Sequence, residues 1–160
     1  MGLRRQSSLA QSGRRPDLPI LGSCSIFYRD CEEIMGWDIS ESGFQIALSP
    51  KLPELIQQRF GDDLTGFLTD YGLNRGDIGN WVIHTGGPRV LEAVERTLGL
   101  SKRDLRLSWE GLRRHGNISS ASVLLVLEET MTSRRPAPGT PGLLAAMGPG
   151  FCSELILMRW

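Results

Sequence analysis

Two polar side chains in this sequence occupy positions where proteins often carry out chemistry, and His84 is the first of them. It follows the apolar run 81–83, which predicts a short strand, and it precedes Gly86, Gly87 and Pro88. Proline after a glycine turn favours the first position of a helix. His84 is therefore expected at a corner where a strand ends and a helix begins. The free N–H groups and positive dipole of such a helix end can stabilise a developing oxyanion beside an imidazole.

Asn117 is the second of these side chains. It follows Gly116, which is expected to end one helix, and it precedes the apolar run 121–127. Its amide can donate a hydrogen bond beside the imidazole of His84. Two purely structural interpretations stand beside this one: His84 as a hydrogen-bonded histidine at a strand end, and Asn117 as a helix N-cap, worth ~1 kcal/mol against alanine. A capping asparagine can also keep a fixed geometry for function.

Composition excludes several other classes of function. The 160 residues suit one domain, and 18 basic residues balance 18 acidic ones, so the chain lacks the basic excess of a nucleic-acid binder. No apolar stretch approaches the ~20 residues that span a bilayer. The three cysteines, Cys24, Cys31 and Cys152, and the two histidines have no metal-ligand spacing. The expected setting is a reducing cytoplasm, with no metal, nucleic acid or membrane as partner.

The beginning of the chain predicts a tail followed by two strands. Residues 1–18 carry four arginines among polar residues and are interpreted as a disordered or non-native tail, although their composition also resembles an organelle presequence. Residues 20–28 predict a strand. The alternation over 44–48 predicts a half-buried strand with Ile46 in the core.

Helices are predicted in the middle of the chain. Pro53 opens a helical pattern that softens at Gly61 and stops at Gly72. A second helix is expected from Pro88 to Gly99, where its apolar residues recur at near-helical spacing.

The last third of the chain predicts two more helices and a pair of strands. Leu105, Trp109 and Leu112 mark one face of a helix. The helix after Asn117 is apolar on nearly every side, so it is expected to be buried inside a layered fold. After an exposed loop at 133–141, strands at 143–147 and 151–158 are joined by a tight glycine-proline-glycine turn. This alternation of helices and strands favours an α/β fold.

Three segments together resemble the chalcone and stilbene synthases, which are type III polyketide synthases. They are WVIHTGGP at 81–88, GNISSA at 116–121, and MGPG at 147–150 followed by an apolar strand. Their order and spacing match the C-terminal half of that family over about residues 20–160. The resemblance implies a thiolase-like half in which helices pack on a mixed five-stranded sheet, forming one domain over 19–160.

The resemblance also implies a reaction. In this family of acyltransferases, a cysteine thiolate takes an acyl group from an acyl-CoA starter, malonyl-CoA is decarboxylated to an enolate, and the enolate attacks the acyl thioester. His84 and Asn117 match the family's histidine and asparagine, which hydrogen-bond the thioester carbonyl and stabilise its developing negative charge. The histidine also pairs with the cysteine and keeps it ionised. Acyl-CoA and malonyl-CoA are then the substrates, and no separate cofactor is expected.

Further site residues are implied by the same match. Those expected along the coenzyme A arm belong to the turn after His84: Gly86, Gly87, Pro88 and Arg89. Those expected beside the active site and in its wall come from the other two motifs: Ser119, Gly148, Pro149 and Gly150. Ile46 falls in a region that lines the acyl cavity in the family, which is the alternative to its placement in the core.

The family's nucleophile has no counterpart in this sequence. It belongs to the N-terminal half, and Cys24, Cys31 and Cys152 match none of its motif. The isolated chain is therefore expected to lack condensing activity. An alternative hypothesis is that the chain is a catalytically inactive fragment or interaction module that pairs with an N-terminal half. The resemblance itself implies a homodimer, because the family is homodimeric.

Single residues refine the match. Thr85 and Met147 stand where plant members usually have proline and an aromatic residue, which indicates a bacterial-type member. The ketoacyl carrier-protein synthases also share a histidine and an asparagine in similar places. Their histidine is usually followed by Gln-Ala-Asn, whereas His84 is followed by Thr-Gly-Gly-Pro, and this favours the type III polyketide synthases.

Overall fold

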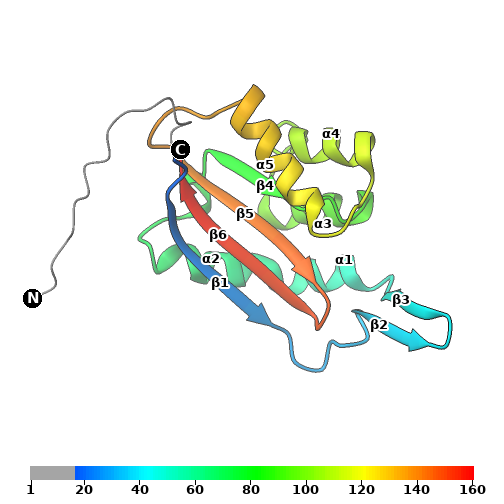
Figure 1. Cartoon of the computed structure of the whole chain (residues 1–160). Helices are drawn as coiled ribbons and strands as arrows, with labels where there is room; N and C mark the ends of the chain where they lie inside the picture. The colour runs from blue at the N-terminus through cyan, green and yellow to red at the C-terminus, as the bar shows by residue number, and fades with distance from the viewer. Residues whose placement is uncertain (1–16) are drawn as a thin grey trace, which may run out of the picture.

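The computed structural model describes residues 17–160, which form an α/β fold built on a mixed sheet (Figure 1). Four strands lie in the order β1-β6-β5-β4. Their bounds are Ile20–Phe27 for β1, Asn80–Ile83 for β4, Pro141–Gly148 for β5 and Cys152–Arg159 for β6. Strand β4 runs parallel to β5, whereas β1 and β5 are both antiparallel to β6. The mixed sheet with packed helices confirms the expected fold class.

The first long helical segment is one continuous rod of three parts. They are α1, Leu52–Leu55, the π-helical turn η1, Ile56–Phe60, and α2, Gly61–Thr69. The π turn ends directly before Gly61, where the sequence predicts a soft break. A Cβ atom on Gly61 would lie 3.1 Å from Cγ2 of Thr97, so the glycine permits a close approach of the next helix.

The remaining helices end where residue type predicts. Their bounds are Pro88–Leu98 for α3, Arg106–His115 for α4 and Ala121–Ser133 for α5, with a short 3₁₀ turn η2 at Arg75–Asp77. Pro88 occupies the first turn of α3, and Gly99 ends that helix in the left-handed conformation, with φ of 68°. Gly116 follows α4 with φ of 70°. Each of these boundaries was predicted from the sequence and is confirmed.

Alternate side chains of the strands belong to two hydrophobic cores, one on each face of the sheet. Trp81 and Ile83 belong to the larger core, which includes residues of α1, η1, α2 and α3. Val82 points to the opposite face and packs with Val123 and Val126 of α5. Figure 1 shows α1 and α2 behind the sheet and α5 on the near side. The sheet is therefore a middle layer between unequal helical layers.

Helix α5 is less buried than its sequence predicts. Its inner side is buried through residues such as Val123, whereas Leu124 on its outer side is 60% exposed. The expectation of a helix buried on every side is wrong for the described chain, because the sheet and α4 contact only one side of it. Residues 17–160 leave the apolar side chain of Leu124 without a cover.

A separate two-stranded ribbon projects from the body of the molecule (Figure 1). It consists of β2, Met35–Ser40, and β3, Gly43–Leu48, which pair only with each other among residues 17–160. The main sheet of the described chain accordingly has four strands instead of the five that the resemblance implies.

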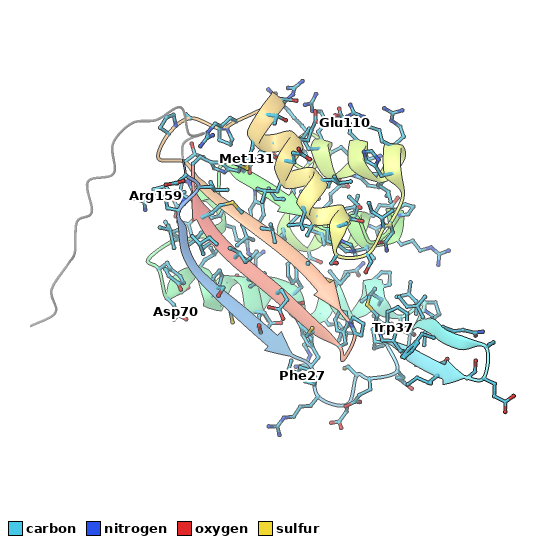
Figure 2. All side chains as sticks on the ribbon, in the orientation of Figure 1. Phe27, Trp37, Asp70, Glu110, Met131 and Arg159 are labelled. Atoms are coloured by element: carbon cyan, nitrogen blue, oxygen red, sulfur yellow. The ribbon has the colours of Figure 1, made fainter. Side chains whose placement is uncertain are left out.

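One face of this ribbon is entirely apolar. The register of the two strands brings six side chains to it: Met35, Trp37, Ile39, Phe44, Ile46 and Leu48. Trp37, labelled in Figure 2, is 53% exposed, and its cross-strand partner Ile46 is 58% exposed. The predicted strand is confirmed, but the placement of Ile46 in the core is wrong. Alternation identifies which side of a strand is apolar and not what covers that side.

The predicted tail over 1–18 falls mostly outside the described residues. Leu18, its last residue, packs against the core around Trp160. Within residues 17–160, none of the helices combines the length and the apolar composition that a bilayer crossing requires.

Candidate active site

His84 lies immediately after β4, at the predicted corner between strand and helix. Its backbone N–H donates to the carbonyl of Ala145 at 2.9 Å, which extends the pairing of β4 with β5 by one residue. Burial lowers the pKa of the imidazole, so the neutral ring is favoured. Within residues 17–160, Nδ1 of His84 has no hydrogen-bond partner. The fold fixes the backbone of His84 and leaves Nδ1 of its ring buried without a protein partner among the described residues.

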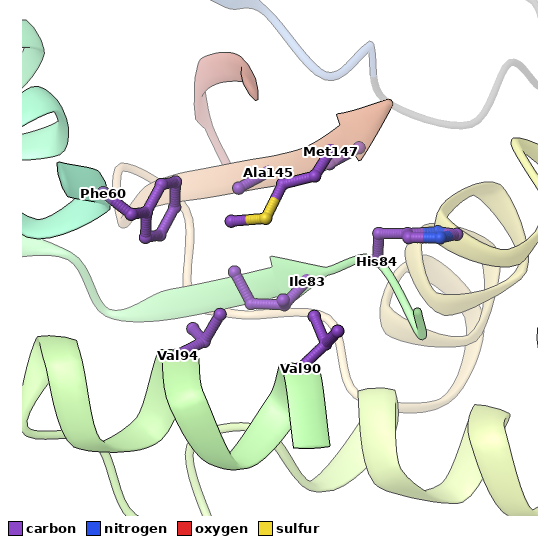
Figure 3. A pocket seen from close by; sticks show the side chains of 8 residues that line it. Phe60, Ile83, His84, Val90, Val94, Ala145 and Met147 are labelled. Carbon is purple, nitrogen blue, oxygen red and sulfur yellow. The ribbon is translucent and has the colours of Figure 1, made fainter. Parts of the chain in front are cut away.

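A small apolar pocket adjoins His84. It is lined by residues of η1, β4, α3 and β5: Phe60, Ile83, His84, Val90, Val94, Ala145, Ala146 and Met147. Figure 3 shows His84 at one end of the pocket, with its ring directed away from Phe60. An imidazole at the edge of apolar surroundings makes stronger hydrogen bonds than one in water.

The turn after His84 leads directly into α3, so the N-terminus of this helix lies close to His84 in the chain. The N–H of Gly86 donates to the carbonyl of His84 at 3.0 Å, and Gly87 takes φ of 144°, a conformation suited to glycine. Gly87 is the N-cap of α3, and no side chain caps this helix end. Arg89 is exposed in the first turn. The uncapped N–H groups and the helix dipole can therefore meet a partial negative charge on a ligand.

Asn117 contacts this turn two residues beyond His84. Its Nδ2 donates to the carbonyl of Gly86 at 3.3 Å, and its Oδ1 accepts from the N–H of Ser119 at 3.0 Å. The interpretation of Asn117 as a helix cap is wrong, because the N-cap of α5 is Ser120. An amide carries two N–H donors, so one donor of Asn117 remains for a ligand.

Thr85 is a residue of this site that the sequence did not single out for its structural role. It is buried at 1% exposure, and its Oγ1 donates to the carbonyl of Gly116 at 3.5 Å. It makes a second tie between the turn after His84 and the loop before α5. Its position directly after His84 and before two glycines is the sequence signal for such a role.

Ser119, two residues after Asn117, has an uncommon backbone conformation, and its place beside the active site stays a prediction. Its φ is 60°, in the left-handed region that is costly for residues other than glycine. Its carbonyl accepts from the N–H of Ser122 at 3.0 Å, so the conformation is held by bonds on both sides. The exposed side chain of Ser119 remains available to a ligand.

The turn of Gly148, Pro149 and Gly150 lies past the pocket. Strand β5 lines the pocket through Ala146 and Met147, and it ends at Gly148. The N–H of Gly150 donates to the carbonyl of Met35 at 3.1 Å, which places the turn at the base of the ribbon. Met147 is the last residue of β5 that lines the pocket beside His84, and the turn itself does not line it. The role of the turn as a wall of the active site stays a prediction.

The cysteines are outside the lining of this pocket. Cys24, Cys31 and Cys152 are free thiols, each partly buried, and none of them lines the pocket beside His84. The thiol of Cys152 contacts the carbonyl of Pro149 at 3.7 Å, and burial raises its pKa, which opposes formation of a thiolate.

Comparison with known proteins agrees with the motifs. Residues 21–160 match the family model of the chalcone and stilbene synthases, C-terminal domain. The chain is 49% identical over 133 residues to 1,3,6,8-tetrahydroxynaphthalene synthase of Streptomyces peucetius subsp. caesius, covering 83% of this chain and 35% of that protein. It is 34% identical over 154 residues to 3,5-dihydroxyphenylacetyl-CoA synthase of Amycolatopsis balhimycina, covering 95% and 41%. The chain thus spans about two-fifths or less of the length of these relatives.

Solved structures show the same fold. The crystal structure of 1,3,6,8-tetrahydroxynaphthalene synthase from Streptomyces coelicolor A3(2), a bacterial type III polyketide synthase, matches with a TM-score of 0.84 and 27% identity over 89% of this chain and 41% of that one. The structure of PKS-I from the brown alga Ectocarpus siliculosus matches with a TM-score of 0.83 and 30% identity over 94% and 42%. By motif, sequence and fold, the chain belongs to the chalcone and stilbene synthase family of type III polyketide synthases, where it corresponds to the C-terminal domain.

Proposed function

We propose that the chain supplies the histidine and asparagine half of a polyketide synthase active site, which condenses malonyl-CoA with an acyl-CoA starter. The observation that carries the proposal is the hydrogen bond from Asn117 to Gly86. It joins the loop of the asparagine motif to the turn of the histidine motif, so two donors separated in the sequence belong to one small region.

His84 would act first in decarboxylation. When malonyl-CoA loses carbon dioxide, the electron pair of the broken carbon–carbon bond moves toward the thioester carbonyl and forms an enolate. A neutral imidazole has one N–H, which can donate to that oxygen. Because burial lowers the pKa of His84, the ring stays neutral and keeps one nitrogen as donor and the other as acceptor.

Asn117 would act with it in condensation. The enolate carbon attacks the acyl thioester, a tetrahedral oxyanion forms, and the thiolate leaves when the carbonyl is restored. The second N–H of the Asn117 amide and the uncapped N-terminus of α3 provide fixed donors for that oxyanion. Gly86 and Gly87 would let the coenzyme A arm pass close to the backbone, with Pro88 and Arg89 beside it.

The nucleophile would come from another polypeptide segment. Each of Cys24, Cys31 and Cys152 lies outside the lining of the pocket beside His84, and no separate cofactor is needed for this chemistry. We therefore propose that the isolated chain does not condense, and that it pairs with an N-terminal half or works within a homodimer of complete subunits.

A second candidate function is that of a catalytically inactive fragment or interaction module. It is favoured by the apolar surface that residues 17–160 leave uncovered, on the ribbon at Ile39, 76% exposed, and on α5 at Leu124, 60% exposed. Such exposed apolar surface is typical of a face that contacts another protein.

The test is reconstitution with the missing half. The chain would be mixed with the N-terminal part of the Streptomyces peucetius synthase that precedes the matched region, and assembly would be followed by size-exclusion chromatography. Release of carbon dioxide from malonyl-CoA and formation of polyketide products would then be measured for the chain alone, for the N-terminal part alone and for the mixture. Activity is expected only in the mixture.

Variants separate catalysis from assembly. In the mixture, Asn117→Ala is expected to lower turnover by roughly 10²-fold, since one oxyanion donor is lost, and His84→Ala by at least as much. Arg113→Gln, on the exposed side of α4, is the control for handling and folding. A mixture that assembles and stays inactive would contradict the catalytic proposal and support the inactive module. Turnover by the chain alone would contradict the need for a second half.

A further inference from the structure

A groove unrelated to His84 opens at the other end of β4. It has a volume of about 480 Å³ and is lined by residues of three regions: Ile78, Gly79, Asn80, Trp81, Arg103, Asp104, Arg106, Leu107 and Arg134. None of these residues lines the pocket beside His84. Asn80 begins β4 and His84 follows its last residue, so the two sites lie at opposite ends of the strand.

The groove gathers positive charge from separate parts of the chain. Arg103 precedes α4, Arg106 is the first residue of α4, and Arg134 follows the last residue of α5. Nη1 of Arg106 lies 3.5 Å from Oε1 of Glu110, one helical turn away, in a half-exposed pair. Within the described residues, Arg103 and Arg134 form no ion pair within 4.0 Å.

The single acidic residue of the lining is already engaged. Asp104 accepts hydrogen bonds from the N–H of Ser101 at 2.8 Å and from its Oγ at 2.6 Å. These bonds lower the pKa of the Asp104 carboxyl, and the charge of Arg103 adds to the effect. The lining thus has three positive charges against one carboxylate that is held by Ser101.

The N-terminus of α4 adds to the positive electrostatic potential of the groove. No side chain caps this helix, and no acidic residue stands in its first turn. Helix N-termini favour acidic residues there, because the dipole is positive at that end. The first residue of α4 is instead the cation Arg106, which adds positive charge beside the groove.

We propose that this groove binds a phosphate-bearing small molecule of about nucleotide size. Guanidinium groups match phosphate oxygens in a bidentate geometry, and three arginines from two segments can contact one phosphate or diphosphate group. The volume lies within the range of small-molecule sites, and Ile78, Trp81 and Leu107 supply an apolar part for the rest of the ligand. A nucleotide carries both the phosphates and the ring system that such a groove would bind.

The test is a calorimetric titration of the 160-residue chain at low salt with two probes, inorganic pyrophosphate and adenosine 3′,5′-bisphosphate. The wild type is expected to bind, and the double variant Arg103→Gln/Arg134→Gln to bind at least about tenfold more weakly, since two charge-assisted contacts are lost. The matched variant Arg103→Lys/Arg134→Lys keeps the positive charges and loses the bidentate geometry of the guanidinium groups, so intermediate affinity is expected. Arg113→Gln, an exposed arginine elsewhere on α4, is expected to bind like the wild type.

Two comparisons complete the test. His84→Gln is expected to leave binding unchanged, which separates this site from the proposed catalytic one. Tighter binding of the nucleotide than of pyrophosphate would assign the groove to a nucleotide, and equal binding would assign it to the phosphates alone. Absence of binding by the wild type, or equal affinity in the Arg103→Gln/Arg134→Gln variant, would overturn the proposal.

Discussion

The side-chain amide of Asn117 donates a hydrogen bond to the backbone carbonyl of Gly86 at 3.3 Å, across 31 positions of sequence. Thr85 supports the same junction from inside through Gly116. The turn after His84 and the loop before α5 are thereby held as one unit. A substitution in the turn after His84 or in the loop before α5 is therefore expected to change the conformation of the other.

The first prediction concerns the stability of this junction. Asn117→Ala removes the bonds to Gly86 and Ser119 and is expected to lower the free energy of unfolding by about 1–2 kcal/mol, less than two buried bonds would cost because Asn117 is exposed. Ser120→Ala is the matched control, since the Ser120 side chain makes no capping bond and a change within about 0.5 kcal/mol is expected. Urea denaturation measures both. Equal losses of unfolding free energy in the two variants would contradict a stabilising role for the bonds of Asn117.

The second prediction concerns the pH dependence of stability at His84. Burial lowers the pKa of the folded imidazole below its ordinary value of 6.5, so the unfolded chain binds a proton first as the pH falls through that value. The free energy of unfolding should therefore decrease on acidification and be fully restored above it. His84→Gln lacks this contribution.

The measurement for this pH effect is denaturation of the wild type and of His84→Gln at about pH 7.5 and about pH 5. The wild type is expected to lose more stability between the two conditions than His84→Gln does. His115→Gln, which removes the exposed imidazole at the end of α4, controls for the substitution itself. Parallel losses in the wild type and His84→Gln would contradict the burial effect.

A third prediction concerns the partly buried polar cluster of Tyr28, Asp63 and Ser153. The hydroxyl of Tyr28 donates to Oδ2 of Asp63 at 2.8 Å and lies 3.1 Å from Oγ of Ser153, and burial raises the pKa of this phenol. Tyr28→Phe leaves both partners unpaired and is expected to cost about 1–3 kcal/mol of unfolding free energy. Tyr71→Phe is the control, because that tyrosine is 41% exposed. Thermal denaturation that ranks the two variants equally would argue against the cluster as a stabilising element.

A fourth prediction compares two glycines, one with free space where a Cβ atom would stand and one without. Gly66 lies inside α2 with open space where a Cβ would stand, so Gly66→Ala is expected to stabilise the protein by about 0.5–1 kcal/mol. At Gly142 a Cβ would collide with Nε1 of Trp160 and lie 3.2 Å from Cγ of Met158. Gly142→Ala is therefore expected to destabilise by about 1–3 kcal/mol. The two midpoints in urea should move in opposite directions, and movement in the same direction would contradict this account.

Local residue chemistry allowed much of the fold to be predicted. Pro88, Gly99 and Gly116 constrain the backbone by themselves, so the ends of α3 and α4 were readable from the sequence. The corner at His84 followed for the same reason, because an apolar strand and a glycine-proline turn leave few other paths. Backbone constraints of this kind act within a few residues and need no knowledge of tertiary contacts.

Features that depend on contacts between distant segments were not readable. Leu124 and Ile46 have the composition of core residues, and only the three-dimensional structure shows that residues 17–160 leave them exposed. Asn117 has the residue type of a helix cap, and its bond to Gly86 instead depends on the approach of two loops. The support that Thr85 gives to Gly116 is equally a property of the packed structure.

The ribbon of β2 and β3 has a consequence for local opening of the chain. It lacks a third strand and a cover for its apolar face within the described residues, and isolated two-stranded ribbons are only marginally stable in water. Its amide protons are therefore expected to exchange with deuterated solvent sooner than those of the four-stranded sheet. When another surface covers Trp37 and its neighbours, that exchange should slow. The ribbon would thus serve as an internal reporter of assembly, readable by mass spectrometry without any catalytic turnover.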